Sequence, residues 1–156
     1  MIGTLAANLL MPVLTAGMLQ AVKRLGEEGS FEINDLFAGF KKNTGPLIMV
    51  GVIYMAGWLV IGLLVMLLAG GSIAGGLMAG VAGQPGMGAG IGLGGIVIAG
   101  VLSILLGAPL LMAVWFAPAL VFFNDMAPMD ALKASFSANM KNWLVMLVFG
   151  LIVLVL

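Results

Sequence analysis

The sequence predicts an all-α, polytopic membrane protein with about four transmembrane helices and two short amphipathic interfacial helices. Three observations predict this fold class. The hydrophobic fraction is 63 % and the charged fraction only 8 %, against about 45–50 % and about 25 % in ordinary soluble domains. All charges fall into two clusters, Lys23 to Lys42 and Asp125 to Lys141. The uncharged stretches beside these clusters are long enough to be membrane spans, which need about 20 helical residues.

The predicted spans are residues 1–22, 46–68, 91–123 and 143–156, and they form a single transmembrane domain over residues 1–156. A connector at 69–90 separates the second span from the third, because residues 70–95 hold twelve of the 24 glycines and Gly83-Gln84-Pro85-Gly86 is a turn signal. The alternative is an additional span within 70–92.

Residues 1–22 resemble a signal peptide in length, but Lys23 and Arg24 follow the apolar run instead of preceding it. The last apolar stretch covers only about 21 Å as a helix. Both ends of the chain are apolar without polar flanks, so we expect the chain to be a fragment of a longer protein.

Two spans between the charged clusters place both clusters on one side of the membrane. All six Lys and Arg residues then lie on that side, which the positive-inside rule identifies as the cytoplasm.

The first charged cluster contains an amphipathic helix. Its apolar residues recur at i, i+3, i+4 and i+7, namely Ile33, Leu36, Phe37 and Phe40. Ser30 is the predicted N-cap, and Gly45-Pro46 ends the helix.

The second cluster repeats this pattern, with Met129, Leu132, Phe136 and Met140 as the apolar stripe and Pro128 at the first helical position. Such helices lie at the lipid interface or pack on the protein's own cytoplasmic end. The two halves correspond at Ala38-Gly39-Phe40 with Ala134-Ser135-Phe136 and at Pro12 with Pro118, which indicates duplication or chance similarity.

The composition excludes several kinds of chemistry. The chain has no cysteine and no histidine, which removes disulfide frameworks, thiolate nucleophiles and histidine acid–base catalysis. The net charge is zero, so nucleic-acid binding has no electrostatic footprint. No charged residue lies within a predicted span, whereas ionisable groups in the bilayer are typical of ion pathways and proton relays. We therefore predict no enzyme and no catalytic, cofactor-binding or metal-binding residue.

Four weaker patterns each have a functional and a structural explanation. Thr4, Asn8 and Thr15 share a face of the first span, as a polar path or as interhelical hydrogen bonds. Gly107-Ala108-Pro109 predicts a kink, or a broken helix around a binding site. The acidic residues Glu27, Glu28, Glu32 and Asp35 form a cation site or a solvated loop. The close-packing motif of membrane helices occurs three times, as Gly71-xxx-Gly75, Gly76-xxx-Gly80 and Gly88-xxx-Gly92.

The segments 35–54 and 115–150, with Phe116-Ala-Pro-Ala-Leu120, Ala134-Ser-Phe136 and Asn142-Trp143, resemble an uncharacterised family of conserved hypothetical bacterial inner-membrane proteins. The resemblance covers about two-thirds of the chain. It implies the bacterial inner membrane, further spans before and after this chain, and no site. The usual proline after the Asn-Trp pair is absent, since Val145 stands near that position.

The predicted function is a membrane-structural or accessory subunit that contacts the lipid bilayer and packs with itself or with a membrane protein partner. The alternative is a small transporter or channel, with a polar path along the first span and a helix broken near Pro109.

Overall fold

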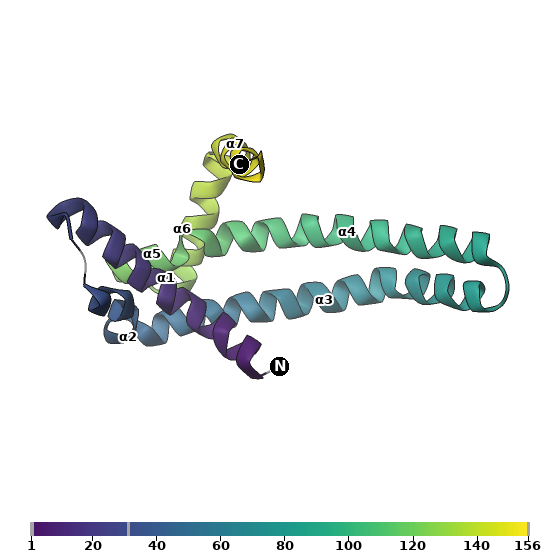
Figure 1. Ribbon diagram of the computed structural model, residues 1–156, viewed down its shortest axis with the longest axis horizontal. Helices are drawn as coiled ribbons and strands as arrows, with labels where there is room; N and C mark the ends of the chain where they lie inside the picture. The colour runs from purple at the N-terminus through teal and green to yellow at the C-terminus, as the bar shows by residue number, and fades with distance from the viewer. Residues whose placement is uncertain (1, 31, 156) are drawn as a thin grey trace. The chain divides into compact units, whose positions relative to one another are not determined.

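The computed structural model describes residues 2–30 and 32–155, together with the side chains of 9–30, 32–84, 86–150 and 152. Every regular element in these ranges is helical (Figure 1). The predicted all-α class is therefore confirmed. In chain order the elements are α1 (Ile2–Glu28), η1 (Ile33–Phe37), α2 (Ala38–Lys41), α3 (Thr44–Val81), α4 (Pro85–Trp115), α5 (Ala117–Asn124), α6 (Pro128–Lys141) and α7 (Trp143–Val155), where η1 is a 3₁₀-helix.

Two compact units divide the chain. The first unit combines Met1–Met55 with Leu111–Leu156, and the second unit is Ala56–Leu110. The second unit is a helical hairpin made from the end of α3 and most of α4 (Figure 1).

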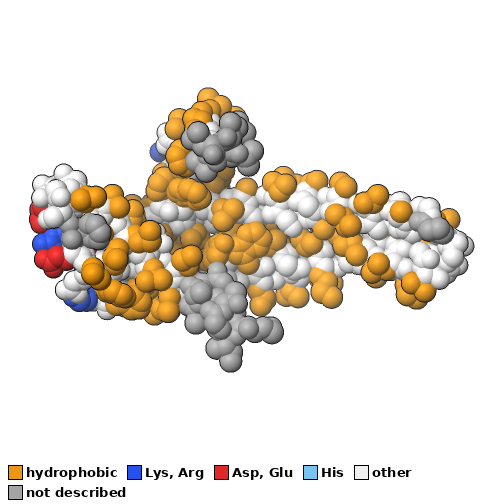
Figure 2. All heavy atoms as spheres, in the orientation of Figure 1, with side chains coloured by type: hydrophobic (Ala, Val, Ile, Leu, Met, Phe, Trp, Pro, Cys, Tyr) orange, Lys and Arg blue, Asp and Glu red, His pale blue; other side chains and the backbone are white. Residues whose placement is uncertain are grey.

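Within the described residues, two helices are long and apolar enough to cross a membrane, Thr44–Val81 and Gly86–Asn124. Only 11 % and 6 % of their most apolar stretches are buried within the protein. The core helix of a soluble protein would be mostly buried, so these helices present their apolar surface outward. On the face shown in Figure 2, hydrophobic and uncharged side chains cover the hairpin.

The glycine-rich connector predicted at 69–90 is largely wrong. Helix α3 continues to Val81 and α4 begins at Pro85, so only Ala82, Gly83 and Gln84 lie outside the helices. Gly83 has a φ of +80°, which suits the turn. No additional helix lies within 70–92, so the alternative of an extra span there is not found either.

Glycines explain why the helices continue to the tip of the hairpin. A methyl group added to Gly76 would lie 2.5 Å from the Gly92 nitrogen, and one added to Gly88 would lie 2.6 Å from the Gly76 carbonyl oxygen. The two backbones are therefore in direct contact at this level. Of the three predicted close-packing motifs, the pair Gly76-xxx-Gly80 and Gly88-xxx-Gly92 make this contact, whereas Gly71 faces open space.

The core of the first unit is small and apolar. It joins residues from four helices: Val13, Ala16, Leu47, Val50, Ala117, Val121, Phe122, Ala131 and Leu132. No buried side-chain nitrogen or oxygen among the described residues lacks a hydrogen-bond partner. This core fixes α1, α5, α6 and the start of α3, and thereby positions the charged segments.

Candidate functional site

The segment formed by η1 and α2 crosses α1 at two glycines, Gly17 on α1 and Gly39 on α2. A methyl group added to Gly17 would overlap the Leu36 carbonyl, and one added to Gly39 would overlap the Val13 carbonyl. Since only glycine permits so close an approach, the backbones of η1 and α2 rest directly on α1. This contact was not predicted from the sequence, because neither glycine belongs to a repeated motif on its own helix.

The predicted N-cap of this segment is wrong. Ser30 is exposed and lies outside the helix, and Glu32 is the N-cap instead. The Asp35 carboxylate accepts the Glu32 amide hydrogen at 2.9 Å, within a reciprocal capping box. The reciprocal contacts between Glu32 and Asp35 therefore cap this helix in place of Ser30.

The predicted apolar face of this segment is not buried in the protein. Phe37 and Phe40 are 50 % and 41 % exposed, and their rings lie 6.2 Å apart. Ile33 is exposed as well. These side chains point away from the unit's own core, as an interfacial helix requires and as a helix packed on the protein by this face would not.

Arg24 forms ion pairs with three acidic residues around the end of α1. Its guanidinium contacts Glu28 at 2.8 Å, Asp35 at 3.2 Å and Glu32 at 3.7 Å. The pKa of Asp35 is lowered, first by the Glu32 amide and then by Arg24. Three of the four acidic residues considered as a cation site are thus paired with Arg24. Among the described residues, no three acidic side chains are arranged to hold a metal ion.

The two charged clusters meet at Lys42 and Asp125. The Lys42 ammonium lies 3.1 Å from Asp125, and the Asn43 amide donates to Asp125 at 2.7 Å and to the Val121 carbonyl at 2.9 Å. Asn43 and Asp125 both adopt left-handed backbone angles, with φ of 59° and 52°, a conformation for which Asn and Asp are enriched. The pKa of Asp125 is lowered, mainly by the hydrogen bond from Asn43 and then by Lys42.

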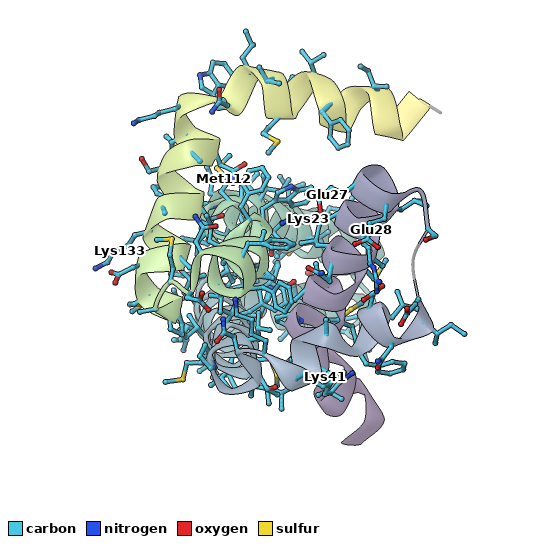
Figure 3. All side chains as sticks on the ribbon, turned by 90° about the vertical axis from the view of Figure 1, so that its left-hand side faces the viewer. Lys23, Glu27, Glu28, Lys41, Met112 and Lys133 are labelled. Carbon is cyan, nitrogen blue, oxygen red and sulfur yellow. The ribbon has the colours of Figure 1, made fainter. Side chains whose placement is uncertain are left out.

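An open cavity of about 440 Å³ lies between α1, η1, α2 and α5. Lys23, Lys41 and Lys42 line it, with Gln20, Asn34 and the rings of Phe122 and Phe123 among its other walls. The Lys23 ammonium lies 5.4 Å from the centre of the Phe123 ring, and the Lys42 ammonium 5.7 Å from that of Phe122. Figure 3 shows Lys23 on α1 and Lys41 on α2, two elements that cross. The cavity thus combines cationic groups with an aromatic wall.

Ser135 and Asn139 of α6 form a polar node at the junction of α4 and α5. The Ser135 hydroxyl donates to the Met112 carbonyl at 2.8 Å and accepts the Phe116 amide hydrogen at 3.0 Å. In an uninterrupted helix the Phe116 amide would donate to Met112 directly. Ser135 is thus inserted into this one hydrogen bond, and Asn139 donates a further bond to Met112 at 2.8 Å.

The buried face of α6 differs from the predicted one. Ala131, Leu132, Ser135 and Asn139 are buried, whereas Met129, Phe136 and Met140 are exposed. Only Leu132 of the predicted apolar stripe faces the core. The polar node decides this orientation, because Ser135 and Asn139, which bond the Met112 carbonyl, lie about 90° around the helix from the centre of the predicted stripe.

The alternative of a helix broken near Pro109 is not found. Helix α4 continues through Pro109 to Trp115, and the interruption lies at Phe116, two residues before Pro118. Gly107 provides space for a neighbouring ring, since a methyl group there would lie 3.0 Å from the Trp58 side chain.

The predicted polar stripe on the first span is seen only at Thr15. The Thr15 hydroxyl donates to the Met11 carbonyl of its own helix at 2.8 Å. The side chains of Thr4 and Asn8 lie outside the described residues. A groove of about 430 Å³ beside Thr15 is lined mainly by apolar groups, including Pro12, Trp115 and Pro118.

Comparisons with protein-family models, with curated proteins and with solved structures found no match.

Proposed function

We propose that this chain is a four-span protein of the bacterial inner membrane and acts as a membrane-structural or accessory subunit. The proposed spans lie within α1, α3, α4–α5 and α7. In this proposal the protein packs with itself or with a partner subunit, contacts lipid through its interfacial helices and has no catalytic role. The observation that carries it is the outward-facing apolar surface of the hairpin, of which so little is buried within the protein.

The ion pair between Lys42 and Asp125 supports the sidedness. Both charged clusters lie in the first unit, where this ion pair joins them. Two membrane crossings between the clusters would return the chain to the same side, as this contact requires. The positive-inside rule then favours the cytoplasm for that end.

The length of helix α3 supports a role in assembly. Helix α3 has 38 residues, which is about 57 Å at 1.5 Å per residue, against a hydrocarbon core of about 30 Å. Its last turns carry no charge and expose Leu77, Met78 and Val81. Apolar helix surface beyond what a bilayer covers is best explained by contact with another protein, either a second copy or a partner.

The geometry favours this role over the transporter or channel. A binding site at a broken helix needs unpaired backbone groups in mid-membrane, and α4 is continuous through Pro109. The Thr15 hydroxyl is already bonded to its own helix.

Site-specific photocrosslinking in membranes tests the proposal. A photoreactive residue at Leu67 or Leu77, which are 79 % and 69 % exposed, should yield a discrete adduct with a protein or a second copy. The same residue at Ile61, which is 7 % exposed, should yield none between chains. Adducts with lipid alone at all exposed positions, together with solute flux in proteoliposomes, would favour the transporter.

A further inference from the structure

We propose that the cavity bounded by Lys23, Lys41 and Lys42 binds the phosphate of an anionic phospholipid headgroup. This inference rests on the proposed membrane location and goes beyond it, because it assigns one site and one class of lipid to a surface that would otherwise attract anions diffusely. The cavity lies entirely within the first unit.

The charges around the cavity favour an anion. Three lysines line it against a single carboxylate, that of Asp35. Asp35 is already paired with Arg24 at 3.2 Å and bonded to the Glu32 amide. Its negative charge is thus compensated from outside the cavity, and the lysines dominate within it.

Each lysine retains capacity to bind. An ammonium group has three donors. Lys41 donates to the neutral Asn34 amide oxygen at 2.6 Å, Lys42 contacts Asp125, and Lys23 lies 4.0 Å from Glu27, at the limit of an ion pair. Lys41 therefore brings the least neutralised charge and should contribute most to binding a phosphate.

The apolar surroundings distinguish a lipid from free phosphate. The rings of Phe122 and Phe123 form one wall of the cavity. Exposed Phe37 lies on η1 with Asn34, and exposed Phe40 lies on α2 with Lys41. A phosphate bound at the lysines would leave its glycerol and acyl chains against aromatic side chains. Inorganic phosphate would leave that apolar surface unused.

The test uses the full chain in nanodiscs of phosphatidylcholine, titrated with phosphatidylglycerol and read by native mass spectrometry. Retained phosphatidylglycerol should exceed phosphatidylcholine about tenfold. Lys41→Gln should reduce this preference about fivefold, the effect of about one lysine near an anionic surface. Lys133→Gln is the matched control, because Lys133 is exposed on α6 and extends away from the unit (Figure 3).

Three results would overturn the site. Equal losses of lipid preference from Lys41→Gln and Lys133→Gln would show diffuse attraction. Displacement of the lipid by millimolar inorganic phosphate would show a free-phosphate site. Equal retention of both lipids would show no selectivity. Thermal unfolding of both variants verifies that they are folded. Carbonate extraction of native membranes separates the two proposals: a chain that resists extraction but shows no lipid preference loses only the lipid site, whereas an extracted chain contradicts both.

Discussion

Lys42 and Asp125 form an ion pair of 3.1 Å although the whole hairpin lies between them in the chain. Asn43 completes the contact by bonding Asp125 and the Val121 carbonyl. The entry into α3 and the exit from α5 are thereby joined. This contact links the two charged clusters within the first unit.

The acid stability of the first unit should depend on this contact. The pKa of Asp125 is lowered in the folded chain, so its stabilising effect is present above the unfolded value of about 3.9 and lost as the pH falls through the folded value. Melting temperature in mild detergent should be constant from about pH 7 to pH 5 and fall below about pH 4. Asp125→Asn should lower the melting temperature at pH 7 and reduce its fall below about pH 4. An unchanged melting temperature of the Asp125→Asn variant at pH 7 would contradict a stabilising contact.

The hairpin tip should not tolerate a methyl group where the helices touch. Gly76→Ala and Gly88→Ala place a carbon against the opposite backbone, which should destabilise the hairpin by about 1–3 kcal/mol. Gly71→Ala meets open space on the same helix and should be neutral or stabilising by about 0.5–1 kcal/mol. Thermal unfolding in mild detergent, compared across these variants, measures the difference in stability. Equal behaviour of the Gly76 and Gly71 variants would refute the backbone contact.

The crossing of α1 by η1 and α2 should depend on Gly17 and Gly39. Alanine at either position overlaps a main-chain carbonyl, so we expect a loss of about 1–3 kcal/mol and faster proteolysis at residues 29–32. Gly26→Ala is the control on α1, because nothing lies within 4 Å of the added methyl group. Unchanged proteolysis of the Gly39 variant would show that the segment does not rest on α1.

Ser135 should stabilise the junction of α4 and α5. Ser135→Ala leaves the Phe116 amide hydrogen without its partner, which should cost about 1–3 kcal/mol. Ser137→Ala removes a hydroxyl from an exposed position two residues away and should have little effect. A double-mutant cycle with Asn139→Ala measures the coupling through Met112. Additive losses would show that the two side chains act independently.

The long-range features of the fold followed from charge and hydrophobicity. Two apolar helices between Lys42 and Asp125 were expected because the uncharged run of 82 residues is long enough for two spans and Gly83-Gln84-Pro85-Gly86 divides it. Both amphipathic segments are helical, and Pro128 begins α6 as expected. Gly45 and Pro46, which were expected to end the first segment, lie in the first turn of α3 instead.

The remaining details depend on contacts that no local pattern contains. Glycine is a poor helix former in isolation, so residues 69–90 were expected to be a connector. The contact between Gly76, Gly88 and Gly92 makes the absence of side chains favourable there. The buried face of α6 was missed for a similar reason: hydrophobicity ranks Phe136 above Ser135, but only the hydroxyl can complete the interrupted bond at Phe116.

Cysteine accessibility in intact cells tests the central claim, a hairpin that crosses the membrane with both charged clusters in the cytoplasm. The chain contains no cysteine, so single cysteines at Glu27, Gln84 and Lys141 report three positions without interference. A membrane-impermeant maleimide should label the cysteine at Gln84 from outside, and those at Glu27 and Lys141 only after permeabilisation. Labelling at Lys141 but not at Gln84 in intact cells would contradict the account.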